Sequence, residues 1–218
     1  MKIIITGGGG FLGSQLATTL LNRGDLTGPS GGQEPIDELV LIDVRFHVAQ
    51  NAPRMQQLVG NISNRNVIDE AIGNSQNISV FHLASMVSGE CEERYDDALR
   101  VNLDGGRNIF EAARAAPGRP RVVFASSIAS FGGAAMPTPV SDLAKQTPQT
   151  TYGMTKAMCE LLVNDHTRKG HFDGRSARLP TVIIRPGKPN AAASSWASGM
   201  FREPLNGETC ELPVHRDQ

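Results

Sequence analysis

Short runs of apolar residues alternate along this chain with longer segments whose apolar positions recur every three or four residues. The runs lack the polar alternation of a half-exposed strand and are typical of parallel strands buried on both faces. They occupy residues 3–6, 39–43, 80–83, 121–125 and 182–185, with a weaker candidate at 57–62. Strands that alternate with helices predict an α/β fold with a doubly wound parallel sheet.

Three of the intervening segments are expected to be helices: one that follows the glycines of residues 7–10, one at 103–116 and one at 152–167. Side chains three or four positions apart share one face of a helix. The apolar residues expected to be buried on these faces are Leu12, Leu16 and Leu20, then Ile109, Phe110 and Ala113, then Ala157, Met158, Leu161 and Leu162. Residues 25–35 are rich in Gly, Pro and Ser, so we expect a surface loop there.

Composition narrows the class of protein. The chain has 218 residues, 39% of them hydrophobic, with 21 Lys and Arg against 22 Asp and Glu. No basic surplus indicates a nucleic-acid partner, and no apolar run has the length of a signal peptide or a membrane span. Cys91, Cys159 and Cys210 have neither disulfide-framework nor metal-ligand spacing. We therefore expect a cytoplasmic protein with reduced thiols, no metal and no membrane partner.

A glycine-rich turn joins the first expected strand to the first expected helix. Gly7, Gly10 and Gly13 are spaced three apart within residues 6–13. Glycines let backbone N–H groups approach a pyrophosphate, and the helix N-terminus adds partial positive charge. A flexible polyglycine turn is the alternative interpretation, but the strand before and the helix after favour a phosphate cradle.

Asp43 ends the second expected strand, where a dinucleotide fold recognises the adenosine ribose. Its carboxylate can accept hydrogen bonds from ribose hydroxyls and would repel a 2′-phosphate, which favours NAD over NADP. The separation from the glycines exceeds the usual ~20 residues because of the insertion at 25–35. Arg45 lies close enough to weaken the preference for NAD, and Asp43 could instead cap the turn that follows it.

Tyr152 and Lys156 are four residues apart in an expected helix, so their side chains share a face. An ammonium near a phenol favours the phenolate and should lower the pKa of Tyr152. Ser127 follows a strand directly, at the sheet edge where doubly wound folds bind ligands. A Tyr four before a Lys also occurs by chance, and the surrounding motifs are what favour a proton-transfer group.

These motifs together resemble the extended short-chain dehydrogenase/reductase superfamily, which includes NAD-dependent sugar epimerases and dehydratases. The matching stretches are residues 6–13, 82–84, 101–105, 126–132, 152–156 and 185–187. Within the superfamily, residues 87–90 and 185–193 resemble enzymes that oxidise four-carbon sugar acids such as D-erythronate. Two departures are Asn61, where Asp is more common, and Phe131, where Tyr is common.

The resemblance implies a role for each matching residue. Tyr152 would be the general base, Lys156 would bind the nicotinamide ribose, and Ser127 would bind the reacting oxygen. The implied NAD-binding residues are Gly7, Gly10, Phe11, Leu12, Gly13, Asp43, Asn61, Ile62, Leu83, Ala84, Asn102, Tyr152, Lys156 and Pro186. The implied substrate-binding residues are Ser88, Ser127, Tyr152 and Asn190. The reaction would be oxidation of a sugar acid to its 2-oxo acid, with hydride transferred to NAD.

The resemblance also implies a domain division, with a Rossmann-like NAD-binding domain at residues 1–185. Residues 186–218 would begin a small, incomplete substrate domain, as expected of a C-terminally truncated chain. Two other functions stay open: a nucleotide-sugar epimerase or dehydratase, and an inactive dinucleotide-binding protein. Relatives commonly pair through helices equivalent to 103–116 and 152–167, so a homodimer is one expected assembly. Ser85 or Lys188 could serve the substrate, whereas His82 is expected to be a core residue.

Overall fold

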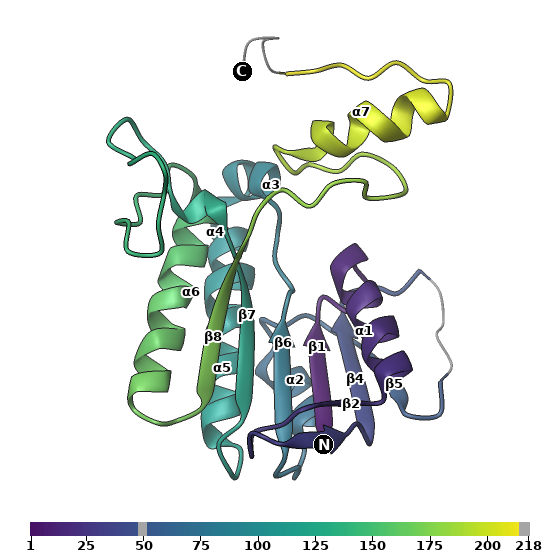
Figure 1. Ribbon diagram of the computed structural model, residues 1–218, viewed down its shortest axis with the longest axis vertical. Helices are drawn as coiled ribbons and strands as arrows, with labels where there is room; N and C mark the ends of the chain where they lie inside the picture. The colour runs from purple at the N-terminus through teal and green to yellow at the C-terminus, as the bar shows by residue number, and fades with distance from the viewer. Residues whose placement is uncertain (48–51, 214–218) are drawn as a thin grey trace.

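A six-stranded parallel sheet forms the centre of the computed structural model, which describes residues 1–47 and 52–213 (Figure 1). Its strands are β1 (Lys2–Thr6), β4 (Glu38–Asp43), β5 (Met55–Val59), β6 (Ile78–His82), β7 (Arg121–Ser127) and β8 (Asp173–Leu179). Their order is β5-β4-β1-β6-β7-β8, so the winding reverses between β1 and β6. This confirms the predicted doubly wound sheet and places the ligand crevice at the carboxyl ends of these two strands.

Helices cover both faces of the sheet. They are α1 (Phe11–Arg23), α2 (Arg65–Ile72), α3 (Ser88–Glu93), α4 (Tyr95–Ala98), α5 (Gly105–Ala115), α6 (Thr151–Arg168) and α7 (Ser195–Leu205). Two short turns of other helix types, η1 (Leu99–Asp104, π) and η2 (Ile128–Ser130, 3₁₀), complete the helical elements described. Helix α1 lies on one face of the sheet, and α2, α5 and α6 lie on the other (Figure 1).

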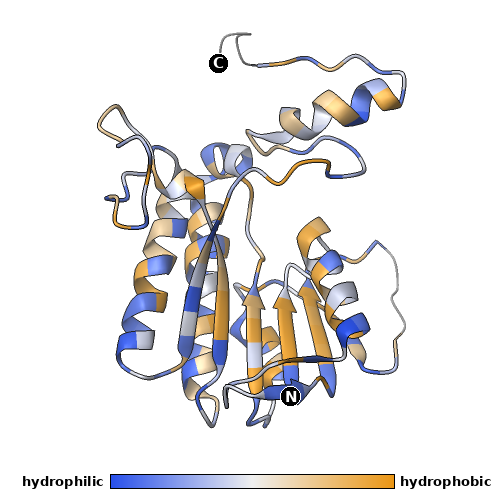
Figure 2. Cartoon of the chain, in the orientation of Figure 1, coloured by the Kyte–Doolittle hydropathy of each residue, from blue (hydrophilic) through white to orange (hydrophobic). Residues whose placement is uncertain are grey.

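Strand β1 contributes to two separate cores. Ile3 and Ile5 pack with Ala17 and Leu20 of α1, whereas Ile4 packs with the α2, α5 and α6 side of the sheet. Successive side chains of a strand point to opposite faces, so a strand covered on both sides needs apolar residues at every position. Figure 2 shows the resulting hydrophobic colour along the central strands. The unbroken apolar runs in the sequence have this origin.

The expected strand at residues 182–185 is wrong. The sixth strand of the sheet is β8, and Pro180 follows its last residue, Leu179. Proline has no N–H to donate to a ladder, so the strand ends there. The apolar residues Val182 and Ile183 are 43% and 46% exposed. Ile184 has φ 53, a conformation that a strand does not adopt.

The surface loop expected at residues 25–35 contains a two-stranded antiparallel ribbon. Its strands are β2 (Asp25–Thr27) and β3 (Gln33–Pro35), and Asp25 pairs with Pro35. Gly31 has φ 89 and permits the reversal between them. The Arg121 guanidinium Nη1 donates to the Thr27 carbonyl at 2.6 Å, which ties the ribbon to β7.

The buried faces of α1 and α6 are rotated from those expected. Helix α1 buries Gly13, Ala17 and Leu20, while Leu12 is 37% exposed. On α6, Met158 and Leu161 are 40% and 63% exposed. The buried residues of α6 are instead small or polar: Gly153, Thr155, Lys156, Ala157, Cys159, Glu160 and Val163. Apolar periodicity is misleading here because this helix buries polar groups that have partners. No helix in residues 1–47 and 52–213 is long and apolar enough to cross a membrane.

Candidate active site

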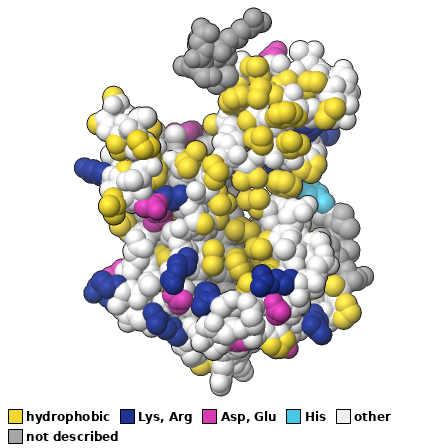
Figure 3. All heavy atoms as spheres, viewed as in Figure 1, with side chains coloured by type: hydrophobic (Ala, Val, Ile, Leu, Met, Phe, Trp, Pro, Cys, Tyr) yellow, Lys and Arg dark blue, Asp and Glu magenta, His cyan; other side chains and the backbone are white. Residues whose placement is uncertain are grey.

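Two adjoining cavities lie at the carboxyl ends of the parallel strands. One has a volume of about 620 Å³ and the other of about 820 Å³. The residues that line both are Gly7, Gly10, Phe11, Leu83, Ser85, Met86, Val87 and Arg185. Figure 3 shows hydrophobic side chains gathered around α7 and between α7 and the sheet. The cavities therefore form a continuous depression at the point where the strand order reverses.

The glycine-rich turn is tight because backbone approaches backbone on both sides. Gly7 has φ 73, and a Cβ there would lie 2.8 Å from the amide nitrogen of Ala84. A Cβ at Gly13 would lie 2.1 Å from the carbonyl oxygen of Gly7. Helix α1 begins after Gly10 with no side-chain cap and no acidic residue in its first turn. Its positive end is thus left for an anion in the cavity.

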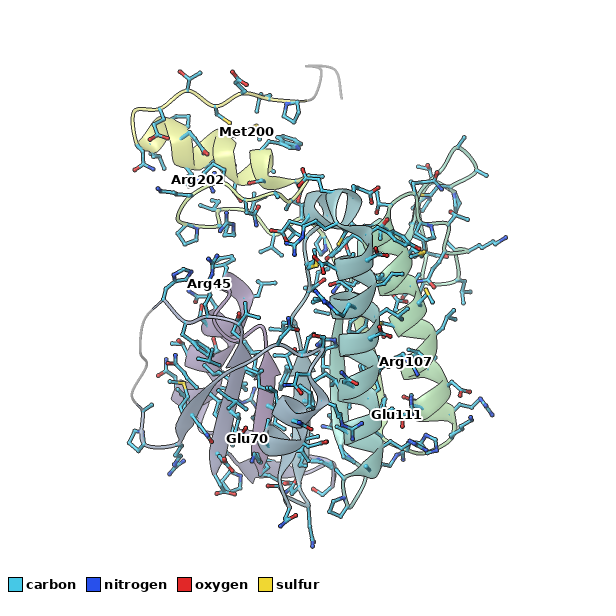
Figure 4. All side chains as sticks on the ribbon, turned by 180° about the vertical axis from the view of Figure 1, so that it is seen from behind. Arg45, Glu70, Arg107, Glu111, Met200 and Arg202 are labelled. Carbon is cyan, nitrogen blue, oxygen red and sulfur yellow. The ribbon has the colours of Figure 1, made fainter. Side chains whose placement is uncertain are left out.

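Asp43 lies at the end of β4, as expected, and lines the larger cavity with Asn61 and Ile62. Its Oδ2 accepts a hydrogen bond from the Gly9 amide at 2.9 Å. Its Oδ1 lies 3.4 Å from the Arg45 amide, which it accepts as a weak turn cap. The structure therefore confirms that Asp43 caps the turn that follows it, while its carboxylate also lines the cavity and recognition of a ribose stays a prediction. Arg45 extends on the side of the sheet that faces α7 (Figure 4).

Leu83 and Ala84 follow β6 and line the cavity beside the glycine turn. Ala84 N donates to the hydroxyl of Thr6 at 3.2 Å. The same hydroxyl lies 2.7 Å from Nδ1 of His82, which is fully buried and whose pKa is lowered to about 3 by that burial. The structure confirms the prediction that His82 is a hydrogen-bonded core residue. Pro186 also lines the larger cavity.

Ser127, Tyr152 and Lys156 all line the smaller cavity. Ser127 is the last residue of β7, and its hydroxyl is close enough to the Tyr152 phenol to lower the pKa of that phenol. Lys156 Nζ donates to the Ala125 carbonyl at 2.8 Å and lies 5.4 Å from the centroid of the Tyr152 ring. Two separate sequence motifs predicted these three residues, and the fold brings them together.

The pKa values differ from expectation. Burial raises the pKa of Tyr152, and the Ser127 hydrogen bond offsets this only in part. Burial also lowers the pKa of Lys156 to about 8. The expected lowering of the Tyr152 pKa is therefore wrong for the free protein, because desolvation of the phenol outweighs the favourable contacts.

Gly153 explains how Tyr152 reaches Ser127. A Cβ at Gly153 would lie 2.0 Å from the Ala129 carbonyl oxygen, so only glycine lets α6 approach η2 this closely. Thr150 caps α6, accepting the Gly153 amide at 3.0 Å. The first turn of α6 is thereby fixed against the residues that follow Ser127.

Three predicted site residues have contacts that differ from those expected. Asn102 is buried in η1 and lines neither cavity; its Oδ1 accepts from the Met86 amide at 2.7 Å. Asn190 is exposed and also lies outside both cavities, where its Oδ1 accepts from the Ala192 amide at 3.3 Å. Ser88 lines the smaller cavity, and its hydroxyl accepts from the Ala193 amide at 2.8 Å.

Sequence reasoning missed several residues that line the cavities. Thr181 and Met86 carry no distinctive motif, so nothing in the sequence marks them. Arg185 is different, because it stands in the stretch 185–187 that matched the superfamily. It lines both cavities, and no ion pair forms on it in the part of the chain that the structure describes. Its Nη2 donates to the Lys188 carbonyl.

Comparison with known proteins gives a consistent result. Residues 3–217 match the model of the "NAD dependent epimerase/dehydratase family". The chain is 46% identical over 214 residues to D-erythronate dehydrogenase of Cupriavidus necator and 45% identical over 218 residues to that of Haemophilus influenzae. These alignments cover 98% and 100% of this chain but only 65% and 66% of the relatives.

A solved structure shares the same fold. It is described as a nucleoside-diphosphate-sugar epimerase from Agrobacterium tumefaciens, with a TM-score of 0.82 and 42% identity. The match covers 99% of this chain and 63% of that structure. The sheet order, the glycine turn and the match over nearly all residues lead to one assignment: this chain belongs to the NAD-dependent epimerase/dehydratase family.

Proposed function

We propose that this protein oxidises a four-carbon sugar acid, D-erythronate or a close analogue, with NAD as hydride acceptor. The observation that carries the proposal is the meeting of Ser127, Tyr152 and Lys156 in a cavity that adjoins the glycine turn. The two relatives at 46% and 45% identity, both named D-erythronate dehydrogenase, support this substrate. The 2-oxo acid as product is part of the same proposal.

The cavities fit a dinucleotide. The uncapped N-terminus of α1 suits a pyrophosphate, and the Asp43 carboxylate suits the adenosine ribose hydroxyls. Asn61, Ile62, Leu83, Ala84 and Pro186 line the remaining wall. Bound NAD would supply the hydride-accepting nicotinamide. Asn102 would act indirectly, by holding the Met86 backbone at the wall of both cavities.

The protein's own part of the chemistry is proton transfer. The Tyr152 Oη would accept the substrate hydroxyl proton while the Ser127 hydroxyl orients the reacting oxygen. Lys156 is protonated below its pKa of about 8, and its charge favours the phenolate that must form. Because the pKa of Tyr152 is raised, the fraction of phenolate, and with it turnover, should increase with pH, although the assisting charge of Lys156 is lost above about pH 8.

Arg185 is the best-placed partner for the substrate carboxylate. It lines both cavities and has no carboxylate partner among the described residues, whereas Arg178 and Arg202 are paired with Glu160 and Glu203. A guanidinium binds a carboxylate through two parallel hydrogen bonds. Ser88 remains a donor to the substrate, whereas Asn190 would have to move to reach it, because only the neighbouring residues Ala192 and Ala193 line the smaller cavity. Residues beyond 185 would accordingly belong to the substrate-binding region.

The direct test is NADH formation, followed by its absorbance, with D-erythronate and with a panel of small hydroxy acids. Tyr152→Phe should lose turnover and keep its NAD affinity within about threefold, because only the proton acceptor is removed. Unchanged turnover in this variant would exclude Tyr152 as the base. NAD binding without turnover on any acid would instead support an inactive dinucleotide-binding protein.

A nucleotide-sugar epimerase is the second candidate, favoured by the Agrobacterium tumefaciens structure at 42% identity. An epimerase returns its hydride to the sugar and yields no net NADH. Incubation with nucleotide-diphosphate sugars, followed by chromatography of the products, distinguishes it from a dehydrogenase.

We also propose a homodimer formed through α5 and α6, which lie side by side on the outer face (Figure 1). Met158 and Leu161 are exposed on α6, and apolar residues of this kind gain from burial in an interface. Sedimentation of the wild type and of Leu161→Glu tests this assembly. The wild type should sediment as a dimer and the variant as a monomer.

A further inference from the structure

A buried carboxylate, Glu160, lies on the same helix as Tyr152 and Lys156 but takes no part in the proposed chemistry. Its side chain is 4% exposed. The Ser126 hydroxyl donates to Oε1, and Gln146 Nε2 donates to Oε2 at 2.9 Å. Arg178 Nε lies 3.1 Å from each carboxylate oxygen, and its Nη2 donates to Oε2 at 2.8 Å. Both oxygens are therefore fully engaged.

The partners of Glu160 come from three segments of the chain. Ser126 and Arg178 are register neighbours on β7 and β8, so they present their side chains to α6 together. Gln146 belongs to the segment 131–150, which connects Ser127 and η2 to the start of α6. Arg178 also lies 4.8 Å from the centroid of the Phe131 ring in the same segment. The Glu160–Arg178 ion pair and the hydrogen bonds around it thus join β7 and β8 to α6 and to the segment 131–150.

Three successive residues of β7 contact α6. The Ala125 carbonyl accepts from Lys156, the Ser126 hydroxyl donates to Glu160, and the Ser127 hydroxyl lowers the pKa of the neighbouring Tyr152 phenol. Glu160 is four residues after Lys156, one helical turn farther along the same face. The Glu160 contact consequently restrains α6 against both translation along its axis and rotation about that axis.

We propose that Glu160, anchored by Ser126 and Arg178, is a positioning residue that holds the Tyr152 phenol beside the Ser127 hydroxyl. A buried ion pair contributes little net stability compared with well-packed apolar residues. Its hydrogen bonds are directional, however, and fix a geometry that apolar packing leaves adjustable. This inference rests on the proposed function for its catalytic meaning, but the geometry it describes can be measured without turnover.

The test uses Ser126→Ala and Glu160→Gln in a Tyr95→Phe background. The chain has only 2 tyrosines, so the ultraviolet absorbance of phenolate then reports Tyr152 alone. Because the Ser127 bond lowers the pKa of Tyr152, a displaced helix should raise the titration midpoint. The kcat should fall roughly tenfold to a hundredfold. NAD affinity should stay within about threefold, since the glycine turn is untouched.

Asp165→Asn is the matched control, because it breaks the exposed pairs with Arg168 and Lys169 on the same helix. It should leave the Tyr152 midpoint and kcat unchanged. If Glu160→Gln does not fold, Ser126→Ala carries the test, because it removes the Ser126 anchor of Glu160 and leaves the ion pair with Arg178 to maintain the fold. A wild-type midpoint in Ser126→Ala, or an equal shift in Asp165→Asn, would overturn the proposal. A shifted midpoint in a protein that oxidises no acid would support the positioning role and refute the proposed function instead.

Discussion

The Lys156 ammonium donates to the main-chain carbonyl of Ala125 at 2.8 Å, inside the protein and beneath the Tyr152 ring. The same nitrogen lies 5.0 Å from the centroid of the Phe124 ring. A lysine in this setting keeps its charge at a cost, and burial lowers its pKa from the ordinary 10.5 to about 8. The structure thus holds a cation beside the proposed base at the expense of stability.

Lys156→Met should show how much stability the protein loses by burying the charge of Lys156. Between pH 8 and 10.5 the unfolded chain holds a proton at Lys156 that the folded chain has lost, so wild-type stability should rise with pH across this window. Below pH 8 the full cost is present. Lys156→Met should therefore be more stable than wild type near neutral pH, by on the order of 3 kcal/mol, and lose this advantage near pH 10.5. Urea unfolding at both pH values measures it, and a variant that is less stable at neutral pH would contradict it.

Asp43→Ala should weaken NAD more than NADP. The substitution removes the acceptor for the ribose hydroxyls and also the 2.9 Å bond from the Gly9 amide. A loss of about tenfold in NAD affinity is the expected scale for one charged hydrogen bond. Titration with each dinucleotide, followed by protein fluorescence, gives the two constants. Equal losses would mean that Asp43 only shapes the turn; Asp43→Asn, which keeps an acceptor oxygen, is the matched variant.

Gly153→Ala should disturb both stability and turnover. The added Cβ would lie 2.0 Å from the Ala129 carbonyl oxygen, so α6 or η2 must move. Overpacking of this kind costs about 1–3 kcal/mol. Thermal unfolding and kcat should both fall, because Tyr152 moves with the helix. Gly32→Ala is the control: its Cβ would meet only Ser30 Oγ at 3.7 Å, and it should behave as wild type.

Arg185→Gln should raise the KM for an acid substrate by about tenfold or more, since a charge-assisted pair is lost. The Kd for NAD should change little. Arg119→Gln, at an exposed position that lines neither cavity, serves as the control and should leave KM unchanged. An unaltered KM in Arg185→Gln would place the carboxylate elsewhere, with Ser88 the next residue to test.

The sequence predicted the central strands because their burial on both faces leaves a continuous apolar signal. The last strand was missed for the opposite reason: β8 is at the sheet edge, and its polar residues, such as Arg175 and Arg178, resemble a loop. Residues 182–185 are apolar without belonging to the sheet, and periodicity cannot distinguish the two cases.

As with the strands, the sequence predicted part of the candidate site and missed part of it. Ser127, Tyr152, Lys156 and Asp43 carry their own motifs, and all four line the cavities. Glu160 was missed because a charged residue on a helix is usually on the surface, and only the fold brings Ser126 and Arg178 to it. The pKa of Tyr152 was predicted in the wrong direction, because sequence shows neighbours along a helix but not the loss of solvent around a phenol.

The two-sided burial of β1 constrains evolution and design alike. A shift of this strand by one residue would exchange the side chains that face α1 with those that face α2, α5 and α6. It would also displace Gly7, which follows the strand directly, by roughly 3.3 Å. Insertions and deletions in residues 2–6 therefore disrupt packing and nucleotide recognition together, so new variants of this scaffold should be sought by substitution there and by changes of length in the β2–β3 ribbon.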